Sequence, residues 1–76
     1  MKPNDIEHLY SEYAQAIFKY VISLGCDLHT AEDLVQETFY QAIRSINRYD
    51  GTCQISVWLC QIAKHLWYRE LERRKK

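Results

Sequence analysis

The stretch TAEDLVQETFYQAIRSINRYDG, residues 30–51, decides the fold of this chain. One set of its residues recurs at steps of three and four, which is the period of a single face of an α-helix. The set consists of Ala31, Leu34, Val35, Thr38, Phe39, Ala42, Ile43 and Ile46. Thr30 is the expected N-cap, because its hydroxyl can accept a hydrogen bond from the backbone at Asp33. The stretch predicts a helix that begins at Thr30, buries this stripe and stops near residues 49–51.

Helical periodicity continues on both sides of this stretch. In the N-terminal segment, Asn4 can cap a helix with Glu7 three residues later, and Gly25 is the expected left-handed residue at its end. The expected buried positions there are Ile6, Leu9, Tyr10, Tyr13, Ile17, Val21 and Leu24. The C-terminal segment is expected to begin at about Cys53 and to bury Ile55, Trp58, Leu59, Ile62, Ala63 and Leu66, with Leu71 as its last apolar position. No stretch alternates with the period of a β-strand, so residues 1–76 are predicted to form a single all-α domain, a compact bundle of three main helices.

Composition and cysteine spacing exclude several classes of protein. Of the 76 residues, 47% are hydrophobic and 26% are charged, which is typical of a small globular domain and not of a disordered chain. Cys26, Cys53 and Cys60 form no C-x-x-C pair, so we expect inert thiols, and neither a disulfide framework nor a metal site. No signal peptide or membrane-length apolar run is visible. We therefore expect a cytoplasmic protein without membrane insertion and without a cofactor.

The net charge of zero conceals two oppositely charged halves. Residues 1–43 contain two Lys or Arg against seven Asp or Glu, and residues 44–76 contain eight against three. An acidic half and a basic half suggest two different partners, the second of them a polyanion. The alternative interpretation is that a short chain acquired this asymmetry by chance.

The expected outer side of the middle helix carries a line of polar residues. We call it the acidic line, and it consists of Asp33, Gln36, Glu37, Tyr40 and Arg44. Acids and an amide around one aromatic ring suit the binding of a basic partner helix. An ordinary solvated helix face is the alternative interpretation.

The third segment offers the opposite kind of surface. Outside its core positions it presents Gln61, Lys64, His65, Trp67, Tyr68 and Arg69, followed by Arg73, Arg74, Lys75 and Lys76. Basic groups interleaved with aromatic rings fit a single nucleic-acid strand, because cations hold phosphates and rings stack on bases. The terminal cations alone are weak support, since they also favour the end of a helix. Trp67 and Tyr68 are adjacent, so at least one is expected to be exposed or half-buried.

These motifs carry a resemblance to a known family. AEDLVQETFYQAIRSINRYDG (31–51), followed by VWLCQIAKH (57–65) and a basic tail, closely resembles domain 2 of the extracytoplasmic-function (group IV) bacterial sigma-70-class sigma factors. LYSEYAQAIFKYV (9–21) is similar to the first helix of that domain. The resemblance implies a domain that binds core RNA polymerase and recognises the melted −10 promoter element in transcription initiation. It also implies an anti-sigma partner, and a chain that is a fragment of a two-domain sigma factor from which the −35-binding domain 4 is absent.

The resemblance also assigns site residues. The contacts to the clamp helices of the polymerase's largest subunit fall on Asp33, Gln36, Glu37 and Tyr40. The family's −10 loop, which receives a base flipped from the stack, falls on residues 49–54, and the following helix contacts neighbouring bases and phosphates. The implied DNA-binding residues are Tyr49, Asp50, Gly51, Thr52, Gln54, Gln61, Lys64, His65, Tyr68 and Arg69. His65 stands where the family commonly has an asparagine, so the promoter sequence stays open, and His65 is alternatively a half-buried packing residue.

Other interpretations are weaker. A helical protein-interaction module with a solubilising tail is the main alternative. A helix-turn-helix that reads duplex DNA is disfavoured, because RYDGTCQ (48–54) is longer than the turn of that motif. No serine or cysteine lies beside a base at a turn, and no glycine-rich phosphate loop is present, so an enzyme is not expected.

Overall fold

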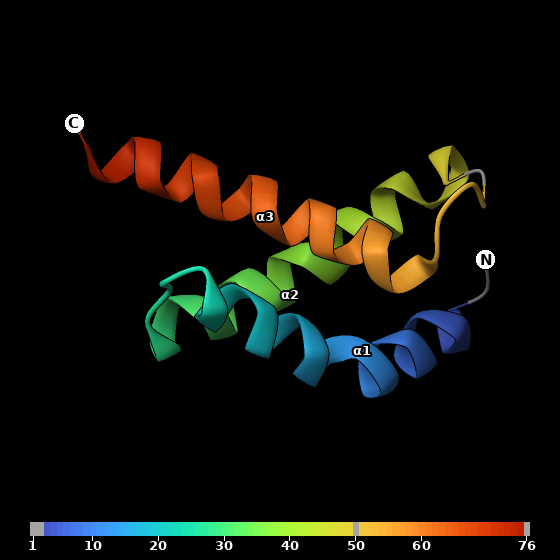
Figure 1. The fold of residues 1–76 in the computed structure, drawn as a ribbon. Helices are drawn as coiled ribbons and strands as arrows, with labels where there is room; N and C mark the ends of the chain where they lie inside the picture. The colour runs from blue at the N-terminus through green and yellow to red at the C-terminus, as the bar shows by residue number, and fades with distance from the viewer. Residues whose placement is uncertain (1–2, 50, 76) are drawn as a thin grey trace.

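Three helices follow one another along the chain and pack into a bundle (Figure 1). The computed structural model describes residues 3–49 and 51–75. Its elements are α1 (Pro3–Ser23), α2 (Leu28–Ser45), the short 3₁₀ helix η1 (Ile46–Arg48) and α3 (Ile55–Arg74). Each main helix packs against the other two, and no strand occurs among the described residues. The predicted all-α bundle of three main helices is confirmed.

The core forms where one face of each helix meets the other two. Ile17 and Val21 of α1 and Leu59 and Ala63 of α3 are fully buried. α2 contributes the largest buried face, which consists of Ala31, Leu34, Val35, Thr38, Phe39 and Ala42. The hydroxyl of Thr38 donates to the Leu34 carbonyl at 2.7 Å, so this buried polar group is satisfied.

Two residues expected in the core are exposed instead. Tyr10 is 43% exposed and Ile43 is 48% exposed. Figure 1 shows that α1 and α2 are joined at one end and separate toward the other, where α2 continues into η1. Tyr10 and Ile43 line the open depression at this wider end, although the Tyr10 ring still contacts Phe39, with 5.0 Å between the ring centroids. The stripe of α2 therefore ends at Ala42 and not at Ile46, which is half-buried in η1.

The turn between α1 and α2 forms as expected at Gly25, whose φ is +101°. The Cys26 N–H donates to the Val21 carbonyl at 3.2 Å, and the Gly25 N–H donates to the Ile22 carbonyl at 3.0 Å. These two bonds are the Schellman arrangement that ends many helices. A residue with a side chain would be strained at this φ, so glycine is required here.

The helix caps differ from those expected. Asp27, and not Thr30, caps α2, and its carboxylate accepts hydrogen bonds from the Thr30 backbone N–H at 3.1 Å and from the Thr30 hydroxyl at 3.0 Å. A carboxylate at this position also faces the positive end of the helix dipole. α1 begins at Pro3, so Asn4 is a helical residue and not a cap, in agreement with the preference for proline in the first turn.

The burial of α3 also corrects one expectation. Trp67, expected on the outer face, is only 4% exposed, whereas Tyr68 is 50% exposed. Leu71, the last apolar position of this segment, is at the surface. Trp67 continues the buried row formed by Leu59 and Ala63, at steps of four residues.

Candidate functional site

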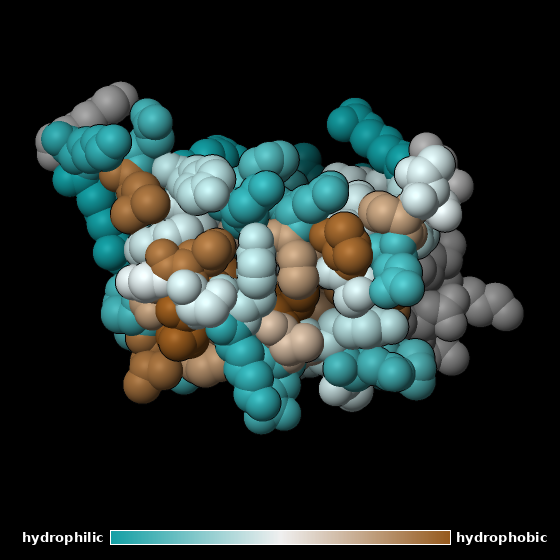
Figure 2. Space-filling view, viewed as in Figure 1, coloured by the Kyte–Doolittle hydropathy of each residue, from teal (hydrophilic) through white to brown (hydrophobic). Residues whose placement is uncertain are grey.

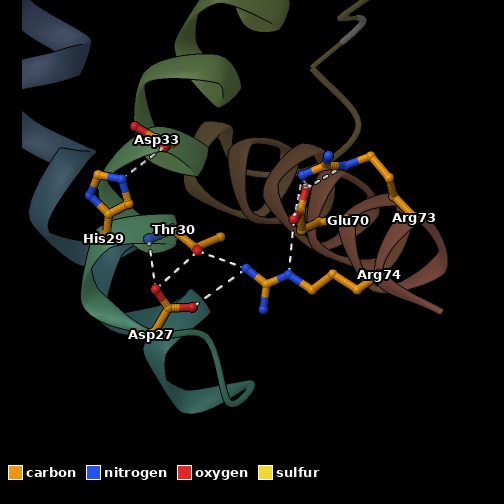
Figure 3. A network of polar contacts seen from close by, with 7 residues as sticks. All are labelled: Asp27, His29, Thr30, Asp33, Glu70, Arg73 and Arg74. Carbon is orange, nitrogen blue, oxygen red and sulfur yellow. Dashed lines mark hydrogen bonds and ion pairs between the residues drawn. The ribbon is translucent and has the colours of Figure 1, made fainter. Parts of the chain in front are cut away.

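The acidic line lies on the outer side of α2, and all five of its residues are exposed. The Arg44 guanidinium lies over the Tyr40 ring, 5.6 Å from its centroid. The Nε2 atom of His29 lies 4.0 Å from an Asp33 carboxylate oxygen (Figure 3). Both pairs are solvent-exposed, so they contribute little to folding and leave the surface open for a partner.

Apolar surface accompanies the acidic line on the side of α1. Tyr10, Tyr40 and Ile43 are exposed large hydrophobic residues, and all three line one depression between α1 and α2. Gln36 lines the same depression, beside Glu7. The line thus combines acids with exposed apolar side chains, which is the composition of a protein-binding surface.

On its other side, the acidic line borders α3. Glu37 lines a depression between α2 and α3 together with Arg69 and Arg73. The resemblance assigns Glu37 to the polymerase and Arg69 to DNA. In the structure the two side chains line the same depression, so the two expected surfaces meet along this groove.

The loop before α3 is closed by Tyr49. Its hydroxyl donates a hydrogen bond to the Cys53 carbonyl, and its ring contacts Trp58, with 5.0 Å between the ring centroids and 33° between the ring planes. Cys53 is held in the loop, and α3 begins at Ile55 and not at Cys53 as expected. The half-buried Tyr49 therefore shapes the loop, and one side of its ring is already occupied by Trp58.

Gly51, Thr52 and Gln54 of this loop lie at the surface. Gly51 has a φ of +80°, which a residue with a side chain rarely adopts. Thr52 and Gln54 are exposed, and Gln54 is the N-cap residue of α3 without a capping side-chain hydrogen bond. Asp50, also expected to bind DNA, lies outside the described residues.

The outer face of α3 brings the other expected DNA-binding residues together. Gln61, His65, Tyr68 and Arg69 are exposed, and Lys64 is half-buried. His65, Tyr68 and Arg69 line one shallow depression together with Glu72 and Arg73. The alternative that His65 is a half-buried packing residue is wrong. A ring, an imidazole and a guanidinium in one open depression can stack on a base and bind a phosphate.

A polar network at the end of α3 was not visible in the sequence. The Arg74 guanidinium donates to the Thr30 hydroxyl at 2.8 Å and to Glu70 at 2.9 Å, and it lies 3.6 Å from the Asp27 carboxylate (Figure 3). It also lies over the Trp67 ring, 5.5 Å from the centroid. These contacts join the end of α3 to the N-cap of α2. Helical periodicity carries no signal for a contact between residues 44 positions apart.

The network shifts the pKa of its carboxyl groups. Hydrogen bonds from Thr30, together with the charge of Arg74, lower the pKa of Asp27. Hydrogen bonds from Arg73 and Arg74 lower the pKa of Glu70, and Arg73 reaches it at 2.7 Å. Two of the four terminal cations are thus already paired within the domain, which leaves Arg69 and Lys64 as the more available cations of α3.

Figure 2 shows the face of the molecule seen in Figure 1. Hydrophilic side chains dominate the end of α3 near the C-terminus, and hydrophobic areas lie lower on this face, divided by hydrophilic side chains. Across the described residues, no helix is both long and apolar enough to span a membrane. In the same part of the chain, no cluster of three or more His, Cys, Asp or Glu side chains is placed to hold a metal ion.

Cys26 and Cys60 have the character of packing residues. Cys26 is buried in the core beside Asp27, and burial is the main cause of its raised pKa. Burial also raises the pKa of the half-buried Cys60. A raised pKa keeps a thiol protonated and unreactive at neutral pH.

Comparison with known proteins identifies similar sequences. The profile of Sigma-70 region 2 matches residues 9–76. The RNA polymerase sigma factor YlaC of Bacillus subtilis (strain 168) is 41% identical over 73 residues, which cover 91% of this chain and 42% of YlaC. The ECF RNA polymerase sigma factor SigM of the same organism is 34% identical over 71 residues, which cover 93% of this chain and 43% of SigM. The chain thus spans less than half the length of these curated relatives, and no solved structure matches it significantly.

Proposed function

Because the chain belongs to the sigma-70 region 2 family, in its extracytoplasmic-function group, we propose that it acts in transcription initiation and joins RNA polymerase to promoter DNA. It would act in the cytoplasm as one domain of a longer, two-domain sigma factor, whose domain 4 binds the −35 element. The length of the relatives, more than twice the aligned part, supports this organisation.

The first half of the proposal concerns the polymerase. The acidic line of α2 binds the clamp helices of the largest subunit, with Asp33, Gln36, Glu37 and Tyr40 as the contacting residues. All four are exposed, and the depression beside Tyr40 offers apolar surface at the edge of the polar contacts. A basic helix laid along α2 would find hydrogen-bonding groups in the line and an apolar anchor point beside it.

The second half concerns the melted −10 element. The outer depression of α3 holds the strand, with Tyr68 stacking on a base and Arg69 and Lys64 binding phosphates. The loop from Tyr49 to Gln54, with Asp50, Gly51 and Thr52, receives a flipped base, and Gln61 and His65 contact neighbouring bases. Flipping costs a few kcal/mol, whereas a stacked base returns about 1–3 kcal/mol, so a strand that is already single is preferred.

One observation carries this proposal beyond family membership. The exposed His65, Tyr68 and Arg69 gather in one depression on α3, whereas the acidic line occupies a different face on α2. A protein-interaction module with a solubilising tail does not require a ring and a guanidinium side by side. The two surfaces border each other at the depression lined by Glu37 and Arg69, and together they allow one domain to hold the polymerase and DNA at the same time.

Fluorescence anisotropy with labelled −10-like oligonucleotides tests the proposal. The domain should bind particular single strands more tightly than the same sequences as duplex, across a salt series. The preferred sequence would show what His65 and the loop select. Equal affinity for every strand and for duplex would reject −10 recognition by this domain and would favour the protein-interaction alternative.

A further inference from the structure

A groove runs between α2 and α3, with Arg69 at its middle. One half is a depression of about 180 Å³ lined by Gln41, Ser45, Ile62, His65, Leu66 and Arg69. The other half is lined by Leu34, Glu37, Leu66, Arg69, Glu70 and Arg73. Leu66 and Arg69 line both depressions, so the two depressions adjoin each other at these two residues.

The two halves differ in charge. The polar groups at the first end are the Gln41 amide, the Ser45 hydroxyl, the His65 imidazole and the Arg69 guanidinium. Each of these groups can donate a hydrogen bond. At the second end, Glu37 and Glu70 present carboxylates, and Arg73 is paired with Glu70. Arg69 lines both ends, but only the second end also carries carboxylates, so an anion is favoured at the first end over the second.

The depressions between α1 and α2 have the opposite character. Their lining includes Glu7 and Glu32 and contains no Lys or Arg among the described residues. They are unsuited to an anion. Compared with the depressions beside α1, the Gln41 end of the α2–α3 groove is therefore the better site for an anion.

Arg69 is available to a ligand. Its guanidinium makes no hydrogen bond or ion pair with another described residue, whereas the guanidinium groups of Arg73 and Arg74 are paired. Arg69 and His65 also line the outer depression that contains Tyr68. A DNA strand with one base stacked on Tyr68 would therefore have its sugar-phosphate backbone next to the Gln41 end of the groove.

We propose that the end of the groove formed by Gln41 and Ser45 of α2 and by His65 and Arg69 of α3 binds a backbone phosphate of the single DNA strand. This inference rests on the proposed function and adds α2 to the DNA-binding surface. Arg69 supplies the charge, and Gln41 and Ser45 supply neutral donors from the opposite wall. Glu37 confines the phosphate to this end, so α2 contacts polymerase on its outer side and DNA on the side facing α3.

Single-strand binding of Gln41→Ala tests the site. This substitution removes a hydrogen bond to a charged phosphate, so the affinity for the single strand should fall by about tenfold. The slope of log affinity against log salt should stay unchanged, because a neutral side chain releases no counterions. Arg69→Ala, by contrast, should lower both the affinity and the slope, the slope by ~0.7 because one phosphate is no longer neutralised. Gln41→Glu keeps the size of the side chain and should weaken binding further, by repulsion.

Gln15→Ala is the matched control, because Gln15 is an exposed amide on α1 that lines the acidic depression. It should bind the strand as the unmodified chain does. Gln41 is half-buried, so urea unfolding checks that its variants keep the fold. Ser45→Ala tests the other neutral donor of α2 independently. Unchanged affinity in both Gln41 variants, with Tyr68→Ala still weakening binding, would overturn the phosphate site and leave the proposed function standing. Failure of the unmodified chain to bind single strands would overturn both.

Discussion

Glu37 stands at the boundary between the two surfaces of this domain. It belongs to the acidic line, yet it also lines the groove that contains Arg69 and Arg73. Its carboxylate has no hydrogen-bond or ion-pair partner among the described residues. A single side chain can therefore favour a basic partner on one side and exclude a phosphate on the other.

A reversed charge at Glu37 should weaken polymerase binding and leave folding nearly unchanged. We expect Glu37→Lys to weaken binding to an isolated clamp-helix fragment by about tenfold or more, because two basic surfaces would then meet. The free energy of unfolding should change by less than about 0.5 kcal/mol, since the side chain is exposed. Titration with the clamp-helix fragment and urea unfolding measure the two quantities.

Glu12→Lys provides the control for this prediction. Glu12 is an exposed acid on α1, where it lies 3.1 Å from His8, outside the acidic line. It makes the same change in net charge but should leave the affinity for the clamp helices nearly unchanged. Equal losses in the two variants would show that only the overall charge matters, and not the acidic line.

At the scale of the elements, Arg74 joins the two helices that carry the two surfaces. It contacts Thr30 and Asp27 at the start of α2, and Glu70 and Trp67 within α3. The network ties the start of α2 to the end of α3, the two helices between which the groove lies.

We expect Arg74→Ala to lower the urea midpoint of unfolding, because it removes all of these interactions together. Lys75→Ala is the control, since it removes one positive charge from the same turn without any of these interactions, and it should leave the midpoint nearly unchanged. Circular dichroism during urea titration measures both. Identical midpoints for the two variants would mean that the network does not stabilise the bundle.

At the scale of the whole molecule, the Arg74 network makes the free energy of unfolding depend on pH. The pKa values of Asp27 and Glu70 are lowered in the folded state from ordinary values of 3.8 and 4.5. The unfolded chain therefore binds more protons than the folded chain in this range, and stability increases with pH. The contribution is complete above the ordinary values and is lost as the pH falls through the lowered ones.

Urea unfolding between pH 7 and pH 3 should show this loss, and Glu70→Gln should flatten the profile. Glu72→Gln is the control, because Glu72 is exposed on the same helix and has no ion pair with another described residue. Added salt should reduce the effect in the unmodified chain, since the groups are exposed. A profile that is equally steep in Glu70→Gln would assign the acid dependence to other carboxylates.

Much of this structure was predictable from the sequence, because it depends on interactions between residues that are close along the chain. The repeat of three and four residues in α2 placed Ala31 to Ala42 in the core, and the position of Gly25 identified the turn after α1. Both depend on residues that are close along the chain. The exposure of the acidic line followed from the same periodicity, because a helix that buries one face must present the other.

Long-range packing decided the rest. Adjacent Trp67 and Tyr68 could not both be buried, and the packing of α3 in the bundle buried Trp67 and left Tyr68 exposed. The divergence of α1 and α2 left Ile43 exposed, and the approach of α3 to the start of α2 paired Arg74 with Asp27. By itself the sequence determined which residues form helices and which face of α2 is buried. Only the tertiary structure decided how the helices meet and which polar side chains share a groove, because these contacts join residues far apart in the chain.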